Sequence, residues 1–117
     1  MANELRISLD TSVESHRVLK CKQNDDRPLV ITLFDSGVAY DITNCNLLLR
    51  CKKPNGVFVT QSETFTIVGN VATIIMAEDI VNVAGVAELE VNITNTVTLK
   101  SVSTYTFYLD IKPVLVG

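Results

Sequence analysis

The chain contains no tryptophan, and aromatic residues of all kinds make up only 6% of its 117 residues. Domains that bind sugars or single-stranded nucleic acids commonly stack their ligands on exposed aromatic rings. This scarcity therefore argues against both classes. Tyr40, Phe58 and Tyr108 are the aromatic residues that we place outside the main core, whereas the alternation of residues 104–107 predicts that Tyr105 and Phe107 are buried.

An excess of basic charge is also missing. Ten Lys and Arg residues stand against thirteen Asp and Glu, which gives a net charge of -3. Nucleic-acid binding requires a basic patch or stripe, so no nucleic-acid partner is predicted. Two small basic clusters, Lys20–Lys22 and Lys52–Lys53, are interpreted as lysines on solvated strand edges, where they discourage pairing with other chains.

The sequence has no apolar run near the roughly 18 residues that a membrane span requires, so no membrane association is expected. The opening residues, MANELRISLD, lack the basic-then-apolar layout of a signal peptide. This predicts synthesis in the cytoplasm. The five glycines are scattered singly at turns, so a glycine-rich phosphate loop is absent and no cofactor is predicted.

Cysteine is scarce, and the count of three is odd. Together with the missing signal peptide, an odd count argues against a disulfide framework. The spacings between Cys21, Cys45 and Cys51 do not match a zinc site. Alternate residues of a strand face the same way, so Cys45 and Cys51 share a face with Leu47 and Leu49. We therefore predict core cysteines, which behave as small hydrophobic residues.

What the sequence does contain is alternation of apolar and polar residues with a period of two, which predicts β-strands. Turn pairs such as Asn55-Gly56 and Gly69-Asn70 separate these runs at the spacing typical of a sandwich. The positions that carry this alternation are 5, 7 and 9; 29, 31 and 33; 45, 47, 49 and 51; 57 and 59; 65 and 67; 71, 73 and 75; 87, 89, 91 and 93; 97 and 99; and 105, 107, 109 and 111.

These patterns predict an all-β fold, a single β-sandwich over residues 1–117 with about eight to ten mostly antiparallel strands. Residues 77–83 break the alternation. They place two acidic residues before an apolar pair and end near Gly85, which predicts one short helical turn. Residues 113–117 are interpreted as an exit segment.

No group of residues forms a convincing catalytic or metal site. His16, the only histidine, lies beside Ser15, whose side chain would point to the opposite face of a strand. A catalytic triad is therefore not predicted, and His16 is expected to be exposed. The acidic residues Asp25, Asp26, Asp35 and Asp41 are interpreted as turn-formers rather than as cation ligands. Glu88 and Glu90 are assigned to a solvated outer face. No partner-binding residue is assigned.

The order of several weak motifs resembles the N-terminal domain of the phage tail baseplate upper protein family. The motifs are PLVITLFD at 28–35, DSGVAYDIT at 35–43, LLLRCKKPNGV at 47–57, AEDIVNVAGVAELEV at 77–91 and a closing alternating strand at 103–111. The resemblance covers residues 7–112, and the order of the motifs carries it rather than any single one. It implies a β-sandwich that anchors to the tail.

The function expected from this resemblance is a structural module of a phage or prophage tail baseplate. Such a module would dock on tail components, position adhesion proteins and form homo-oligomers in the assembled virion tail. The expected partners are other tail and baseplate proteins, and no enzymatic activity is expected. A carbohydrate-binding β-sandwich domain is the alternative hypothesis. A carboxylate-dependent hydrolase that uses Glu88 and Glu90 is the third.

Overall fold

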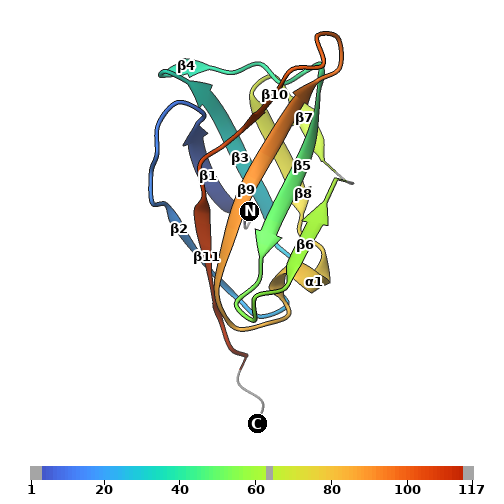
Figure 1. The fold of residues 1–117 in the computed structure, drawn as a ribbon. Coiled ribbons are helices and arrows are strands. Elements are labelled where there is room, and N and C mark those ends of the chain that lie inside the picture. Colours follow the sequence, from blue (N-terminus) through green and yellow to red (C-terminus); the bar gives the residue numbers. More distant parts are fainter. Residues whose placement is uncertain (1–3, 63–64, 115–117) are drawn as a thin grey trace.

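The computed structural model describes residues 4–62 and 65–114. They form two packed β-sheets and one short helix, which confirms the predicted all-β sandwich (Figure 1). The described residues hold eleven strands, against the eight to ten expected, and one of these strands has only two residues. The elements are β1 Leu5–Asp10, β2 Val18–Lys22, β3 Pro28–Asp35, β4 Val38–Ala39, β5 Cys45–Lys52, β6 Phe58–Gln61, β7 Thr66–Val68, β8 Val71–Ile75, α1 Glu78–Val81, β9 Gly85–Asn95, β10 Ser101–Ser103 and β11 Phe107–Lys112.

One sheet has the strand order β1-β3-β8-β7, with β4 paired to β3. The other has the order β2-β11-β9-β5-β6, with β10 paired to β9. Most of the described strand pairs are antiparallel, as predicted, but β1 pairs with β3 and β2 with β11 in parallel. The connection between β1 and β2 crosses from one sheet to the other, so both strands lie at sheet edges on one side of the sandwich, and β6 and β7 lie on the other (Figure 1).

The core lies between the two sheets and consists of the inward faces of alternating strands. Cys45, Leu47, Leu49 and Cys51 of β5 are all buried, with exposures between 0% and 8%. Cys21 is buried on β2 as well. Burying a leucine side chain such as that of Leu47 or Leu49 stabilises the fold by about 1.5–3 kcal/mol. The prediction of core cysteines from residue parity is thus confirmed.

The predicted helical turn is also present, as α1. Its buried residues Ile80 and Val81 close one end of the core. Four residues make too few hydrogen bonds to form a stable helix alone, so packing holds it in place. The side chain of Gln61 on β6 assists, because its Oε1 accepts a hydrogen bond of 2.7 Å from the N–H of Ala77, the residue that precedes the helix.

In β8 the expected apolar positions proved wrong. Ala72 and Ile74 are fully buried, whereas Ile75 is 47% exposed. The register explains this, because Ala72 pairs with Ile31 and Ile74 with Leu29 of β3. Paired residues in neighbouring strands share a face, so the buried residues of β3 determine which face of β8 is buried.

Residues 97 and 99 were also expected to continue a strand, and they do not. Val97 and Leu99 lie in the turn between β9 and β10 and are 78% and 77% exposed. The Oδ1 atom of Asn95 accepts hydrogen bonds from the N–H groups of Val97 and Thr98. This side chain ends the strand by bonding the backbone locally, and Leu99 then adopts a positive φ of 61°.

The burial predicted for Tyr105 is wrong, although Phe107 is fully buried as expected. The chain leaves regular strand geometry between β10 and β11, and Thr104 takes the inward position instead. Its hydroxyl accepts a hydrogen bond of 3.0 Å from the N–H of Val91. This irregular segment reverses the parity, which leaves Tyr105 45% exposed.

Candidate functional site

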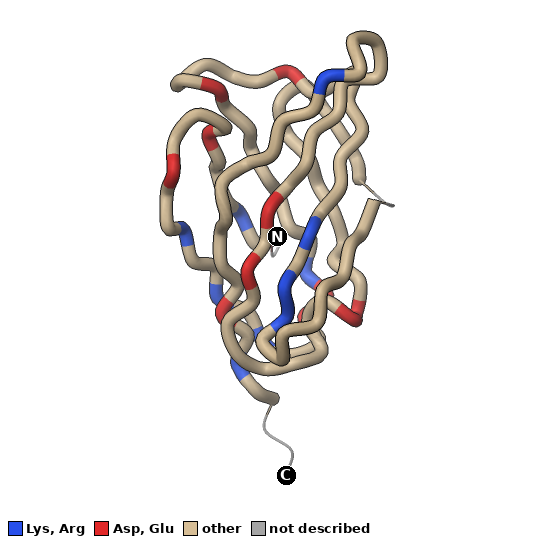
Figure 2. Tube along the Cα trace, viewed as in Figure 1, with Lys and Arg blue, Asp and Glu red and all other residues tan. Residues whose placement is uncertain are grey.

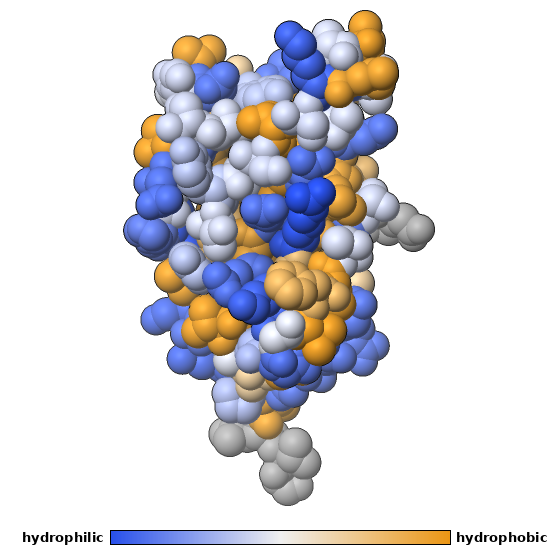
Figure 3. Space-filling view, viewed as in Figure 1, coloured by the Kyte–Doolittle hydropathy of each residue, from blue (hydrophilic) through white to orange (hydrophobic). Residues whose placement is uncertain are grey.

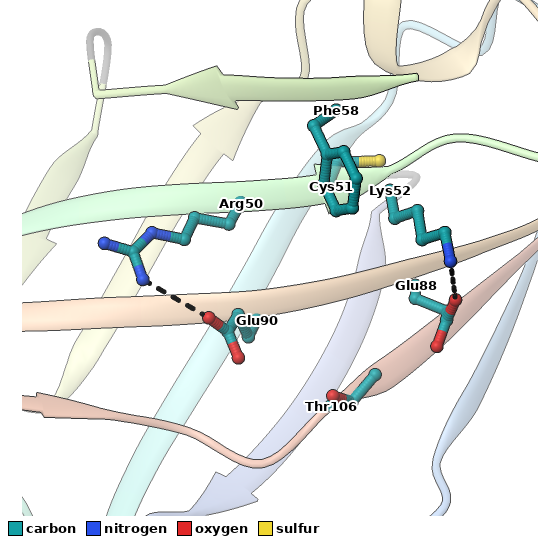
Figure 4. A pocket seen from close by; sticks show the side chains of 7 residues that line it. All are labelled: Arg50, Cys51, Lys52, Phe58, Glu88, Glu90 and Thr106. Carbon is teal, nitrogen blue, oxygen red and sulfur yellow. Dashed lines mark hydrogen bonds and ion pairs between the residues drawn. The ribbon is translucent and has the colours of Figure 1, made fainter. Parts of the chain in front are cut away.

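The outer face of the six-stranded sheet holds a shallow hollow of about 250 Å³. Two cations of β5, two carboxylates of β9, Phe58 of β6 and Thr106 line it, and Cys51 lies beneath (Figure 4). These side chains come together because β9, β5 and β6 are neighbours, and their alternating residues point outward. In Figure 3 polar side chains cover most of this face, with apolar surface beside them in its lower part and again at its upper tip.

The charged groups of the hollow form two cross-strand ion pairs. Arg50 faces Glu90, with 3.5 Å between nitrogen and oxygen, and Lys52 faces Glu88 at 4.0 Å. The strand register places the same residues opposite each other. Figure 2 shows the resulting row of basic positions on β5 beside acidic positions on β9. Exposed pairs of this kind contribute about 0–1 kcal/mol each.

Phe58 is the most exposed aromatic side chain among the described residues, at 75%. The ammonium group of Lys52 lies 5.8 Å from its ring centroid, within range of a weak cation–π interaction. The hollow thus presents one apolar ring beside paired charges. This arrangement suits contact with another surface, since each carboxylate already faces a cation rather than the other carboxylate.

This geometry confirms that Glu88 and Glu90 lie on the outer face, alternating with the buried Ala87, Leu89 and Val91. The side chains of Glu88 and Glu90 remain 48% and 36% exposed. Each carboxylate faces a cation across the strands at an open surface, so the arrangement gives the hydrolase hypothesis no support.

His16 lies on the loop before β2, with its side chain 74% exposed, as expected. Its Nε2 atom is 3.6 Å from Glu14 Oε1, and its ring stacks on Tyr108 at a centroid distance of 6.4 Å. The predicted separation from Ser15 assumed a strand, whereas both residues lie in a loop. The described residues show no hydrogen bond between Ser15 and His16, so the structure adds nothing toward a triad.

Two of the four acidic residues near turns, Asp25 and Asp41, bond the local backbone and local side chains, as predicted. Asp25 accepts hydrogen bonds from the backbone and guanidinium of Arg27, which hold the pKa of that carboxyl below its usual range. Asp41 accepts from the hydroxyl and the N–H of Thr43, which lower its pKa in the same way. Among the described residues no group of three or more potential ligands could hold a metal ion.

Asp10 is the acidic residue that sequence reasoning missed. Its carboxylate accepts hydrogen bonds from the N–H and hydroxyl of Ser12 and from the N–H groups of Ser36 and Gly37. These bonds lower its pKa from 3.8 to about 2, with the Ser12 hydroxyl as the largest cause. Asp10 therefore ties the loop after β1 to the turn between β3 and β4. The Asp-x-Ser pattern could have revealed the local part of this motif.

Burial makes all three cysteines poor nucleophiles. Loss of solvation raises the pKa of Cys21 and of Cys51 to about 11, and it raises that of Cys45 as well. Thiolates, rather than thiols, attack electrophiles and bind metals. These residues therefore act as core side chains.

The prediction that Lys52 and Lys53 guard a strand edge is wrong. β5 lies inside its sheet, between β9 and β6, and Lys53 is only 9% exposed. The Lys53 ammonium donates a hydrogen bond of 2.7 Å to Asn82 Oδ1, beside α1. By contrast, Lys20 and Lys22 do lie on an edge strand, β2, as predicted.

Of the three aromatic residues placed outside the core, only Phe58 is strongly exposed. Tyr40 and Tyr108 are half-buried, and Tyr40 packs against the core cluster.

No helix among the described residues is long and apolar enough to cross a membrane.

Comparison with solved structures is informative, whereas comparison with family models and curated proteins is not. No protein-family model matches the chain. No curated protein matches it either. Among solved structures, the chain is similar to the N-terminal domain of phage TP901-1 ORF48, with a TM-score of 0.69 and 12% sequence identity. The match covers 93% of this chain and 98% of that domain, so the two share a fold over nearly their full lengths.

Proposed function

We propose that the chain is a structural module of a phage or prophage tail baseplate, which docks on tail components and positions adhesion proteins. The observation that supports this most is the fold likeness to a phage domain, which extends over 93% of the chain. The order of motifs in the sequence, from the strand at 28–35 to the closing strand at 103–111, points to the same class of protein.

The surface of the described residues fits an assembly role better than a catalytic one. Its charged side chains pair with one another across strands, and its acidic turn residues bond the backbone. Strongly exposed apolar side chains lie at the turn between β9 and β10 and on β6. Contiguous exposed apolar patches commonly mark contact surfaces, and Val97 and Leu99 lie together in that turn. In this proposal the partners are other tail and baseplate proteins and further copies of the chain.

The proposal also places the chain in the virion tail after synthesis in the host cytoplasm. The test is to purify virions or tails from the phage or induced prophage that encodes the chain. Mass spectrometry and immunogold labelling should find it at the baseplate end of the tail. Its absence from tails that contain the tube and tape-measure proteins would contradict the proposal. A deletion of its gene should leave particles that lack adhesion proteins but keep the tail tube.

The carbohydrate-binding alternative has one observation in its favour, the exposed Phe58 ring beside polar side chains in the hollow. Sugar sites often combine an aromatic platform with hydrogen-bonding groups. A glycan array decides this point. Binding that is lost in a Phe58→Ala variant, or on mutation of Tyr40 or Tyr108, would favour this alternative, and an array without a hit would remove it.

A further inference from the structure

Strand β6 is an edge of the six-stranded sheet, and among the described residues it pairs only with β5. The alternation of hydrogen bonds shows which of its backbone groups remain unpaired. Lys53 donates its N–H to the carbonyl of Val57, so residues 53 and 57 form a hydrogen-bonded pair. In an antiparallel ladder such pairs alternate with non-bonded ones. The N–H and C=O groups of Phe58 and Thr60 therefore point away from β5.

The four main edges of the two sheets differ in how they are protected. β1 contains Arg6 and Asp10, and β2 contains Lys20 and Lys22. Charged side chains on an edge discourage pairing with another strand. β6, with the sequence FVTQ, and β7, with the sequence TIV, contain no charged residue. β6 is the longer of these two unprotected edges, and it carries the exposed ring of Phe58.

We propose that β6 pairs antiparallel with β6 of a second copy of the chain, so that two six-stranded sheets join into one continuous sheet. The two-fold axis passes beside Val59. Phe58 of each copy then forms a hydrogen-bonded pair with Thr60 of the other. This register uses all the outward N–H and C=O groups of both residues, and each donor meets an acceptor. The inference does not depend on a phage role.

The side chains in this register are compatible with a second copy. The two Phe58 rings lie in diagonal positions on the outer face, which are about 7–8 Å apart at the backbone and within reach of aromatic side chains. The nearest charged side chains, Arg50 and Lys52, lie one strand further back on β5. Across the two copies, Lys52, Phe58, Thr60 of the second copy and Arg50 of the second copy lie side by side on four neighbouring strands. Lys52 of one copy and Arg50 of the other are therefore three strand spacings apart, roughly 14 Å. This exceeds the Debye length of about 8 Å at physiological ionic strength.

Four residues per strand make a small interface, below the size of stable dimers. We therefore expect a weak dimer, with a dissociation constant on the order of 0.1–1 mM. Copies held side by side in an assembly would pair far more completely, because their effective concentration reaches the millimolar range. The association should thus be detectable in isolation only at high protein concentration.

The experiment is sedimentation velocity of the full chain, with NMR spectra recorded over the same dilution series. The expected result is a monomer–dimer equilibrium in which the amide signals of Phe58 and Thr60 shift with concentration and exchange hydrogen more slowly in the dimer. A chain that stays monomeric up to about 1 mM overturns the proposal. A dimer whose shifting signals lie elsewhere overturns it as well.

A charge-swap pair tests the register. Phe58→Glu places two carboxylates diagonally across the joint and should weaken dimerisation at least about tenfold. Within one chain the new carboxylate lies opposite Lys52, so the fold should be retained. Mixing the Phe58→Glu and Phe58→Lys variants should restore a heterodimer. Val38→Glu, at a site 69% exposed on β4, introduces the same charge away from β6 and should leave dimerisation unchanged. Failure of the mixture to pair would count against this register.

Discussion

Gly85 offers the sharpest test of how the start of β9 packs against the turn that follows β5. It begins β9 with φ of 128°, a backbone conformation that side-chain-bearing residues rarely adopt. A Cβ atom built at this position would lie 2.7 Å from Cβ of Pro54, in the turn between β5 and β6. Real Cβ atoms do not approach so closely. We therefore predict that Gly85→Ala strongly destabilises the fold.

The structure separates two contributions to this effect. Backbone strain at such a φ costs about 1–3 kcal/mol. Forcing an extra carbon against Pro54 adds about 1–3 kcal/mol, as in overpacked cores, because the contact lies in a proline ring that cannot rotate away. The sum, about 2–6 kcal/mol, is a large share of the 5–15 kcal/mol that stabilises a typical domain.

Gly37→Ala is the matched control. Gly37 also has a positive φ, 80°, but a Cβ there meets no heavy atom within 4 Å. Its replacement should therefore cost only the backbone strain, about 1–2 kcal/mol. Urea denaturation followed by circular dichroism measures both free energies of unfolding, provided that the m-values agree.

A double-mutant cycle isolates the clash itself. Pro54→Gly removes the Cβ that Ala at position 85 would meet, although it also loosens the turn. The double variant should therefore lose about 1–2 kcal/mol less than the sum of the two single variants. If Gly85→Ala costs no more than Gly37→Ala, or if the cycle shows no coupling, then the close approach of β9 to this turn is wrong.

Three further predictions concern the core, an acidic residue and a side-chain bridge. Leu47→Ala should cost about 2–5 kcal/mol in urea denaturation, and Leu48→Ala clearly less, because only Leu47 is fully in the core; equal losses would contradict the assigned faces. The pKa of Asp10 is lowered from 3.8 to about 2, so its stabilising effect is complete above about pH 4 and is lost as the pH falls through 2. The melting temperature of the Asp10→Asn variant should vary less between pH 2 and 4 than that of the wild type. If NMR titration of the wild-type Asp10 carboxyl gave a midpoint near 3.8, the hydrogen bonds assigned to this carboxylate would be wrong. Gln61→Ala should cost about 1 kcal/mol, because the N–H of Ala77 loses its acceptor, and hydrogen exchange at Ala77 should accelerate; unchanged exchange would show that the bridge is dispensable.

The sequence by itself determined the fold class and most of the core. A strand buries every second residue, so parity alone places Cys45, Leu47, Leu49 and Cys51 on one face, and all four are buried. Strand parity likewise assigned Glu88 and Glu90 to the outer face, and turn chemistry assigned Asp25 and Asp41 to bonds with the local backbone. Local chemistry sufficed in these cases, because the signals lie within a few residues of each other.

Only the tertiary structure decided which strands are neighbours, and several properties depend on that. Lys53 is buried because β5 lies inside its sheet and α1 packs nearby, which no local pattern records. Tyr105 is exposed because Thr104 bonds to Val91 on β9 and reverses the parity of its segment. The hollow at Phe58 and the unpaired edge of β6 likewise depend on the strand order. Each depends on contacts between residues distant in the sequence, where periodicity carries no information.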